Sequence, residues 1–223
     1  MVRKSNGSSN SAGAPTVVRA RPRGRGAAAP DRRGRRALAV RQIILRAAAR
    51  AFRRRGFAET GMREIAAEAD LSPGNLYYYF GSKDELLYFC QDHSLDRMLA
   101  TCREVGASRA GAADRLARVI RAHLACMLDE LDGAAAHTEV QALPPLLRAR
   151  IVAKRDRYEA TIRRIVAEGV RSGTFAPCDP TLVTRAVLGA LNWTARWYRP
   201  DGGQPPAAVA DAFANYLVRG LTK

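Results

Sequence analysis

The chain has few acidic residues and few aromatic side chains, and it lacks long apolar runs. Its 223 residues include 21 Asp and Glu against 37 Lys and Arg, which gives a formal net charge of +16. A charge excess of this sign favours a polyanion as partner, either nucleic acid or an anionic membrane surface. No apolar stretch approaches the roughly 18 residues that a membrane-spanning helix needs, so no transmembrane segment is expected.

Cysteine and histidine are scarce and scattered. They form neither a C-x-x-C pair nor a metal-ligand spacing, so they are expected to be structural, and neither a metal nor another cofactor is expected. Free buried thiols fit a reducing compartment, and Arg41 interrupts the one apolar stretch near the start that could resemble a signal peptide. A cytoplasmic protein is therefore expected. The residues concerned are Cys90, Cys102, Cys126, Cys178, His93, His123 and His137.

The basic charge is concentrated at the start of the chain. Residues 1–36 hold ten Arg or Lys against one Asp, so +9 of the net charge lies there and +7 in the remainder. This tail has almost no large apolar side chain and is expected to be disordered. It is either a solvated, nonspecific tail or an arm that follows a DNA minor groove. In the second case, deleting it should weaken DNA binding and flatten the salt dependence.

The remainder has the apolar spacing of helices and no convincing strand. Local signals mark several helix ends: Gly56 as a stop, Ser72 before Pro73 as a start, and Asp179 before Pro180 as another. In the first helix, Leu38, Ile43 or Ile44, Ala47, Ala51 and Phe52 are expected on the buried face. Helices are expected over residues 38–55, 72–80, 82–104, 112–131, 145–171, 180–198 and 206–220, with a short one at 137–143.

Residues 56–87 read GFAETGMREIAAEADLSPGNLYYYFGSKDELL. Two short helical patterns flank a tight turn at Asp70-Leu71, where Asp tolerates the left-handed backbone such a turn often needs. Ser82 to Glu85 forms a capping box that starts the next helix. A short helix, a turn and a second short polar-aromatic helix are typical of a helix-turn-helix, whose second helix enters the major groove of DNA.

Over residues 38–90 the sequence resembles the N-terminal domain of TetR-type transcriptional regulators. The motifs are I-A-x-x-A, then S-x-G-x-L-Y-x-Y-F, then S-K-x-E-L. Gly61 stands where a Thr is common, which removes a hydroxyl that could contact phosphate or cap the helix, and Asp70 stands where Gly is usual. The resemblance implies an all-α fold with a three-helix DNA-binding domain over residues 37–90. A helical ligand-binding and dimerisation domain follows over residues 91–223.

Few side chains of the short helix at 72–80 are long enough to reach base edges. Gly74 allows close backbone approach, Asn75 can pair an adenine edge or bond a phosphate, and Tyr77 can touch a thymine methyl or a phosphate. By resemblance, Tyr79 and Lys83 hold phosphates. By the same resemblance, Arg63 falls at a position that can reach a guanine. Leu76, Phe80 and part of at least one tyrosine are expected in the core. The expected DNA-binding residues are Arg63, Pro73, Gly74, Asn75, Tyr77, Tyr78, Tyr79 and Lys83.

Arg53, Arg54 and Arg55 crowd the end of the first helix. They can complement the negative end of the helix dipole, contact phosphate, or do both.

The last two long helices are too apolar for the surface of a monomer. In the TetR family the matching helices pair with those of a second copy, which places two DNA-binding domains about one DNA turn apart on a palindromic operator. The alternative is that these faces belong to the internal core. The expected dimer-interface residues are Leu182, Val187, Leu191, Thr194, Trp197, Phe213 and Leu217.

The family also holds a small-molecule effector among its C-terminal helices, and the effector shifts the helix at 82–104. The segment R-W-Y-R-P-x-G, from Arg196 to Gly202, resembles a branch that senses acyl-CoA thioesters in fatty-acid or steroid catabolism. Arg196 and Arg199 could hold phosphates and the tryptophans could stack an adenine, or these residues could anchor a dimer and cap a helix. An unrelated apolar or aromatic effector is the alternative ligand. The expected pocket residues are Met127, Leu131, Leu147, Ile151, Tyr158, Ile162 and Arg196.

Residues 105–223 contain no Ser-His-Asp set, glycine-rich phosphate loop or metal set, so no enzyme is expected. The sequence therefore predicts a dimeric, ligand-responsive transcriptional regulator. We expect a repressor that binds a palindromic operator and is released by a small-molecule effector. The alternative is a nucleoid-type protein that binds DNA through charge alone, without a ligand. Operator binding in the presence of excess competitor DNA separates the two.

Overall fold

The computed structural model describes residues 32–128, 139–199 and 201–222. The basic tail up to residue 31, Leu131, His137 and Pro200 lie outside these ranges. Within them no helix is long and apolar enough to cross a membrane. One isolated β-bridge joins Phe175 and Thr222. The helices are α1 (Arg32–Glu59), α2 (Met62–Glu68), α3 (Pro73–Tyr79), α4 (Lys83–Ala107), α5 (Ala112–Leu128), η1 (Val140–Ala142), α7 (Pro145–Arg171), α8 (Pro180–Trp197) and α9 (Pro206–Arg219).

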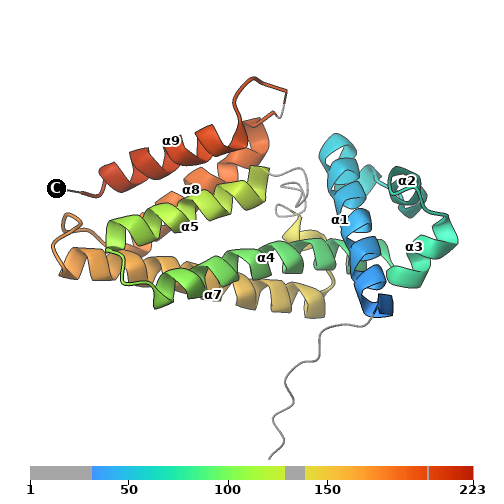
Figure 1. Cartoon of the computed structure of the whole chain (residues 1–223), viewed down its shortest axis with the longest axis horizontal. Coiled ribbons are helices and arrows are strands. Elements are labelled where there is room, and N and C mark those ends of the chain that lie inside the picture. The colour runs from blue at the N-terminus through green and yellow to red at the C-terminus, as the bar shows by residue number, and fades with distance from the viewer. Residues whose placement is uncertain (1–31, 129–138, 200, 223) are drawn as a thin grey trace, which may run out of the picture.

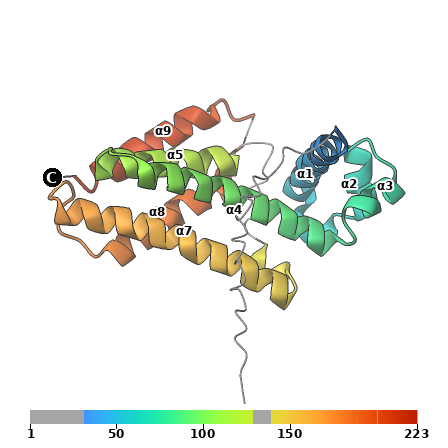
Figure 2. The same ribbon diagram turned by 60° about the horizontal axis from the view of Figure 1, so that its bottom comes forward.

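The helices form two groups that α4 joins. Helices α1 to α3 make a small head at one end, and α5, α7, α8 and α9 make an elongated body at the other (Figure 1). Helix α4 starts against α1 in the head and continues into the body, where it packs on α5 and α7 (Figure 2). This arrangement confirms the all-α fold with an N-terminal helix-turn-helix and a C-terminal helical domain.

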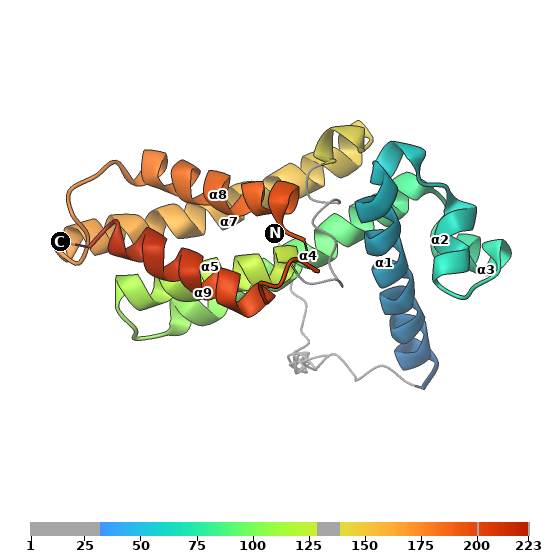
Figure 3. The same cartoon turned by 90° about the horizontal axis from the view of Figure 1, so that it is seen from above.

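Helix α1 begins at Arg32, six residues ahead of the expected start, so the prediction of a disordered tail was wrong for residues 32–36. Its N-terminal turns run past the other helices of the head (Figure 3), which explains why Leu38 is exposed rather than buried. Of the two isoleucines, Ile44 is the buried one and Ile43 is exposed. Gly56 interrupts the helix as predicted, with a φ of 80° that a side chain rarely adopts.

Helix α5 is the centre of the body, because it packs against α4, α7, α8 and α9. Its apolar stripe is buried, as the sequence predicted, and it includes Leu116, Ile120, Leu124 and Met127. At the end of α7, the ring of Phe175 lies against Gly169, where a Cβ would have no room. The side of α5 that carries His123 and Met127 faces a cavity that α4, α7 and α8 also line.

Candidate DNA-binding surface and effector cavity

The helix-turn-helix is built from the local signals that the sequence carries. Asp70 has a φ of 54° and makes the turn between α2 and α3. The Ser72 hydroxyl accepts a hydrogen bond from the Asn75 backbone N–H at 3.2 Å, and Pro73 takes the first helical position. Leu76 is fully buried and fixes α3 to the head. Both Asp70 and Ser72 therefore have the conformations that the sequence predicted.

Most of the expected DNA-contacting residues lie on the open side of α2 and α3. Arg63, Asn75, Tyr77 and Tyr78 are exposed, and Tyr78 keeps 76% of its surface. A Cβ at Gly74 would meet no atom within 4 Å, so nothing inside the chain requires a glycine there. Arg63, Gly74, Asn75, Tyr77 and Tyr78 are therefore all accessible from outside the chain.

Tyr79 and Lys83 are less accessible than the resemblance implied. Tyr79 is half-buried against the core, in agreement with the expected core role for one tyrosine. The Lys83 ammonium donates to the carbonyl oxygens of Phe57 at 2.9 Å, Ala58 at 3.1 Å and Thr60 at 3.0 Å. It also lies 4.4 Å from the centre of the Phe57 ring. An ammonium has three donors, so Lys83 has none left for a phosphate in this conformation.

The arginines at the end of α1 pair with glutamates of α2. Arg54 lies 2.7 Å from Glu68 and 3.7 Å from Glu64, and Arg50 lies 2.7 Å from Glu68. Arg55 adds a contact of 3.4 Å to Glu64. The hydrogen bond from Arg54, and next that from Arg50, lower the pKa of the Glu68 carboxyl. Sequence reasoning considered only the helix dipole and phosphate for this cluster. The structure instead shows ion pairs that hold α2 against α1.

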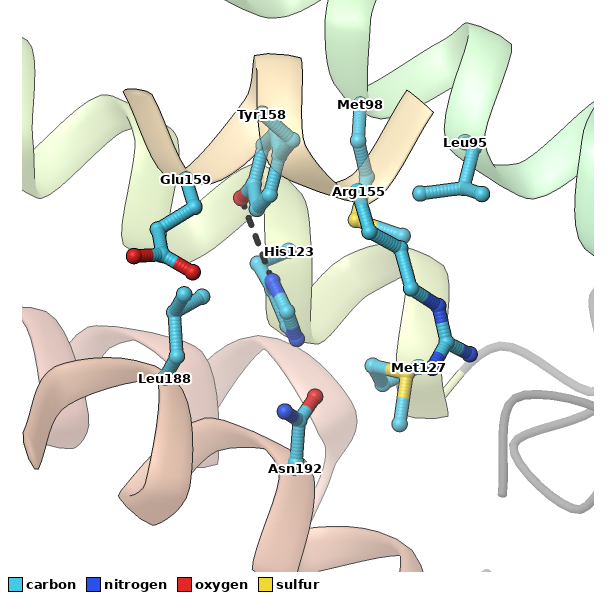
Figure 4. A pocket seen from close by; sticks show the side chains of 9 residues that line it. All are labelled: Leu95, Met98, His123, Met127, Arg155, Tyr158, Glu159, Leu188 and Asn192. Carbon is cyan, nitrogen blue, oxygen red and sulfur yellow. Dashed lines mark hydrogen bonds between the residues drawn. The ribbon is translucent and has the colours of Figure 1, made fainter. Parts of the chain in front are cut away.

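A cavity of about 430 Å³ lies in the body. Its apolar side comes from α4, α5 and α8, and its polar side includes a guanidinium, a carboxylate, an amide and an imidazole (Figure 4). This mixture of an apolar lining with a few convergent polar groups is typical of small-molecule sites. The lining residues are Leu95, Met98, His123, Met127, Arg155, Tyr158, Glu159, Leu188 and Asn192.

A buried pair of polar rings forms one wall of this cavity. His123 Nδ1 lies 3.1 Å from the Tyr158 hydroxyl oxygen, and both residues are almost fully buried. Burial lowers the pKa of His123 to about 4, with a smaller opposing contribution from Asn192, and burial raises the pKa of Tyr158. Both rings are therefore uncharged near neutral pH. Burial likewise lowers the pKa of Arg155.

The expected pocket residues are only partly those that line the cavity. Met127 and Tyr158 line it, whereas Ile151 and Ile162 are fully buried in the core and Leu147 packs on that core from outside the lining. Arg196 is exposed on α8 and does not reach the cavity. The sequence pattern could have identified His123 as a cavity residue. It lies three residues after Ile120 and four before Met127, on the buried stripe of α5. The residues that sequence reasoning missed are Leu95, Met98, His123, Arg155, Glu159, Leu188 and Asn192.

The expected dimer residues divide in the same way. Val187, Leu191 and Thr194 are buried within their own chain, so their side chains offer almost no surface to a second copy. Phe213 and Leu217 are half-buried against the core. Other large apolar side chains of α8 and α9 are exposed, and helical spacing places the three on α8 on one side of that helix. The exposed large ones are Leu182, Trp193, Trp197 and Tyr216.

The segment after Trp193 ends α8 and leads toward α9. Arg199 Nη1 donates to the carbonyl oxygens of Tyr198 at 3.2 Å and Arg196 at 3.4 Å, so it caps the helix C-terminus. Trp197 stacks on Phe213 of α9, with ring centres 6.2 Å apart. This geometry supports the structural interpretation of Arg199, and it places neither Arg196 nor Arg199 at the cavity.

Two family models match the chain. Residues 44–88 match the bacterial regulatory proteins of the tetR family, and residues 109–221 match the tetracyclin repressor-like C-terminal domain. The protein is therefore a helix-turn-helix transcriptional regulator. The chain belongs to the TetR family, which consists of DNA-binding regulators rather than enzymes.

The relatives agree with this assignment along most of the chain. The TetR-family regulator PfmR of Thermus thermophilus is 33% identical, with a TM-score of 0.72 over 81% of this chain and 99% of its own. The transcriptional repressor KstR2 of Mycobacterium tuberculosis is 27% identical over 81% of this chain and 92% of its own. Its structure, described as a ketosteroid transcriptional regulator, has a TM-score of 0.74. The fatty acid metabolism regulator protein of Bacillus subtilis is 23% identical over 80% of this chain and 93% of its own.

Proposed function

We propose that this protein is a dimeric repressor that binds a palindromic operator and is released by an acyl-CoA thioester. Residues 37–90 read DNA and residues 91–223 sense the effector and dimerise. The division falls within α4, which is one helix from Lys83 to Ala107. The two functions therefore share one structural element.

The observation that carries this proposal is the position of the cavity. Leu95 and Met98 of α4 line it together with residues of α5, α7 and α8. The first turns of the same helix pack against α1 of the head. A ligand that fills the cavity acts on α4 directly, and a shift of α4 alters the placement of α3. Release of DNA requires that the ligand binds the shifted state more tightly.

Recognition of DNA is assigned to the exposed face of α2 and α3. Asn75 and Tyr77 reach base edges or phosphates, Gly74 allows close approach, and Arg63 pairs with a guanine. Tyr78 is the most exposed of the three tyrosines. It is assigned to the phosphate backbone of the DNA. Pro73 and Tyr79 position α3, and Lys83 ties α4 to the end of α1.

Dimerisation is assigned to the exposed apolar side of α8 and α9. A second copy of the chain is the occupant, because the family's matching helices pair in this way and the exposed residues lie on both of these helices. Leu182, Trp193, Trp197 and Tyr216 would become buried. Aromatic residues of this kind are enriched in interface cores.

An acyl-CoA effector fits the cavity if the acyl group enters it and the nucleotide stays outside. Side chains of Leu95, Met98, Met127 and Leu188 offer an apolar lining, and about 430 Å³ is within the range of drug-sized ligands. The names of two relatives, a ketosteroid regulator and a fatty acid metabolism regulator, support this class. A free apolar or aromatic molecule of similar size is the alternative effector.

Operator selection from a random duplex library, with excess competitor DNA, tests the first part of the proposal. An inverted repeat should emerge, and a dimer should bind it. Binding that follows charge alone, with no preferred sequence, would support the nucleoid-type alternative.

A thermal-shift panel tests the effector class. The panel contains free CoA, short, long and ring-bearing acyl-CoAs, and the matching free acids. A ligand at about 100 times its Kd adds about 2.7 kcal/mol, a shift of several degrees. Thioesters alone should stabilise the protein and release the selected operator. Stabilisation by free acids, or by nothing in the panel, would refute the acyl-CoA assignment.

A further inference from the structure

The cavity wall contains one polar atom that the fold leaves without a partner. Within the part of the chain that the structure describes, His123 Nε2 is buried and has no partner at hydrogen-bond distance, although Asn192 lies near enough to raise the pKa of the ring slightly as a hydrogen-bonding neighbour. It points into the hollow toward Asn192 (Figure 4). Buried polar atoms are almost always paired, because an unpaired one costs free energy. At the wall of a cavity, the missing partner is supplied by what the cavity binds.

The contact with Tyr158 determines which ring nitrogen carries the proton. The Tyr158 hydroxyl is buried, and His123 Nδ1 is its one hydrogen-bond partner among the described residues. The arrangement that satisfies both groups has the hydroxyl donating and Nδ1 accepting, because the opposite tautomer would leave the phenolic hydrogen without an acceptor among the described residues. A neutral imidazole has a single N–H, which therefore lies on Nε2. The cavity thus presents a fixed hydrogen-bond donor.

We infer that His123 Nε2–H recognises an uncharged carbonyl oxygen of the effector, either a thioester or a ketone. This inference rests on the proposed function, because it takes the cavity to be the effector site. A carbonyl oxygen only accepts, which matches a donor, and the apolar lining accommodates the attached carbon skeleton. The lining holds both a guanidinium, from Arg155, and a carboxylate, from Glu159, and burial of an incoming carboxylate among the apolar side chains would cost desolvation free energy.

Paired ligands that differ by one carbonyl oxygen test this role. Decanoyl-CoA is compared with S-decyl-CoA, which has a thioether in place of the thioester, and trans-1-decalone with trans-decalin. Isothermal titration should show the carbonyl member binding about tenfold more tightly in at least one pair. His123→Phe, which keeps a ring of similar size, should abolish the difference. The matched control is His93→Phe, since His93 stacks on Phe89 away from the cavity lining and should leave the preference intact.

A second measurement needs no substitution and no ligand. Long-range ¹H–¹⁵N couplings of the histidine rings identify the protonated nitrogen of His123 in the unmodified protein. The proton should be on Nε2; a proton on Nδ1 would overturn the inference. Equal affinities within both pairs, a preference that survives His123→Phe, or no binding by either carbonyl probe would also overturn it. If the decalone shows the His123-dependent preference while no thioester releases the operator, the acyl-CoA proposal fails and this inference stands.

Discussion

Replacing Lys83 by Met separates a structural lysine from a DNA-contacting one. The Lys83 ammonium is held by three carbonyl oxygens at 2.9, 3.1 and 3.0 Å. Met keeps an apolar stem of similar length and removes the charge. The Phe57 and Thr60 carbonyls are in half-buried surroundings, whereas that of Ala58 is exposed and can return to water.

The expected loss of stability is about 2 kcal/mol. A hydrogen bond to a charged group contributes roughly 1.5–3 kcal/mol, and water replaces part of what is lost at the exposed edge of the head. For a chain of this length, about 1 kcal/mol lowers the Tm by roughly 2–4 °C, so a shift of about 4–8 °C is expected. Thermal denaturation followed by circular dichroism measures this shift.

The salt dependence of operator binding tests the alternative role, in which Lys83 contacts a DNA phosphate. A lysine that contacts phosphate contributes about 0.9 to the slope of log K against log salt, and a dimer loses this twice. Lys83→Met should leave the slope unchanged. Arg63→Met is the control for an exposed cation and should leave the Tm unchanged. A Lys83→Met protein with an unaltered Tm and a slope smaller by about 2 would refute the structural role.

Three further perturbations follow from single contacts. Gly169→Ala should destabilise the fold by about 1–3 kcal/mol despite the better helix propensity of Ala, because its Cβ would lie 2.1 Å from the Phe175 ring; an unchanged denaturation midpoint would contradict this packing. Acid should destabilise the protein through His123, whose pKa falls from 6.5 to about 4 on burial. The unfolded chain then binds the proton first, so up to about 3 kcal/mol is lost as the pH falls from 6.5 towards 4; denaturant titrations of the native protein and His123→Phe should show a shallower dependence in the variant. Arg63→Ala should cost about 1–3 kcal/mol on operators with the contacted guanine and little on others; an equal loss on all sequences in binding assays would exclude base recognition.

Local signals in the sequence were sufficient for the head, because each acts over a few residues. Asp70 made its left-handed turn, and Ser72 and Asp179 capped their helices as predicted. The capping box at Ser82 also formed, although Glu85 accepts from Gly81 rather than from Ser82. Such contacts depend on sequence neighbours, and helix propensity and capping chemistry determine them before tertiary packing does.

The packing of the body could not be predicted in the same detail. The sequence predicts which side of a helix is apolar, but it does not predict which neighbouring element covers that side. The spacing of Val187, Leu191 and Thr194 shows that one side of α8 is apolar, but it does not distinguish a core face from a dimer face. Likewise Ile151 and Tyr158 both lie on the buried side of α7. Of these two residues only Tyr158 lines the cavity, and the tertiary arrangement determines this difference. Periodicity reports burial, whereas a cavity is a property of several helices together.

Lys83 lies where α4, which lines the cavity, meets the head. Leu95 lines the cavity about 12 Å along α4 from Leu87, at 1.5 Å per residue. An unbroken helix transmits a displacement at Leu95 to its first turn with little loss. There the Lys83 ammonium donates a hydrogen bond to the Phe57 carbonyl near the end of α1. The Glu85 carboxylate accepts a hydrogen bond from the backbone N–H of Gly81, shortly after α3. A lysine that the family resemblance assigned to phosphate therefore fixes α4 to the head, and the proposed effector mechanism would use this connection.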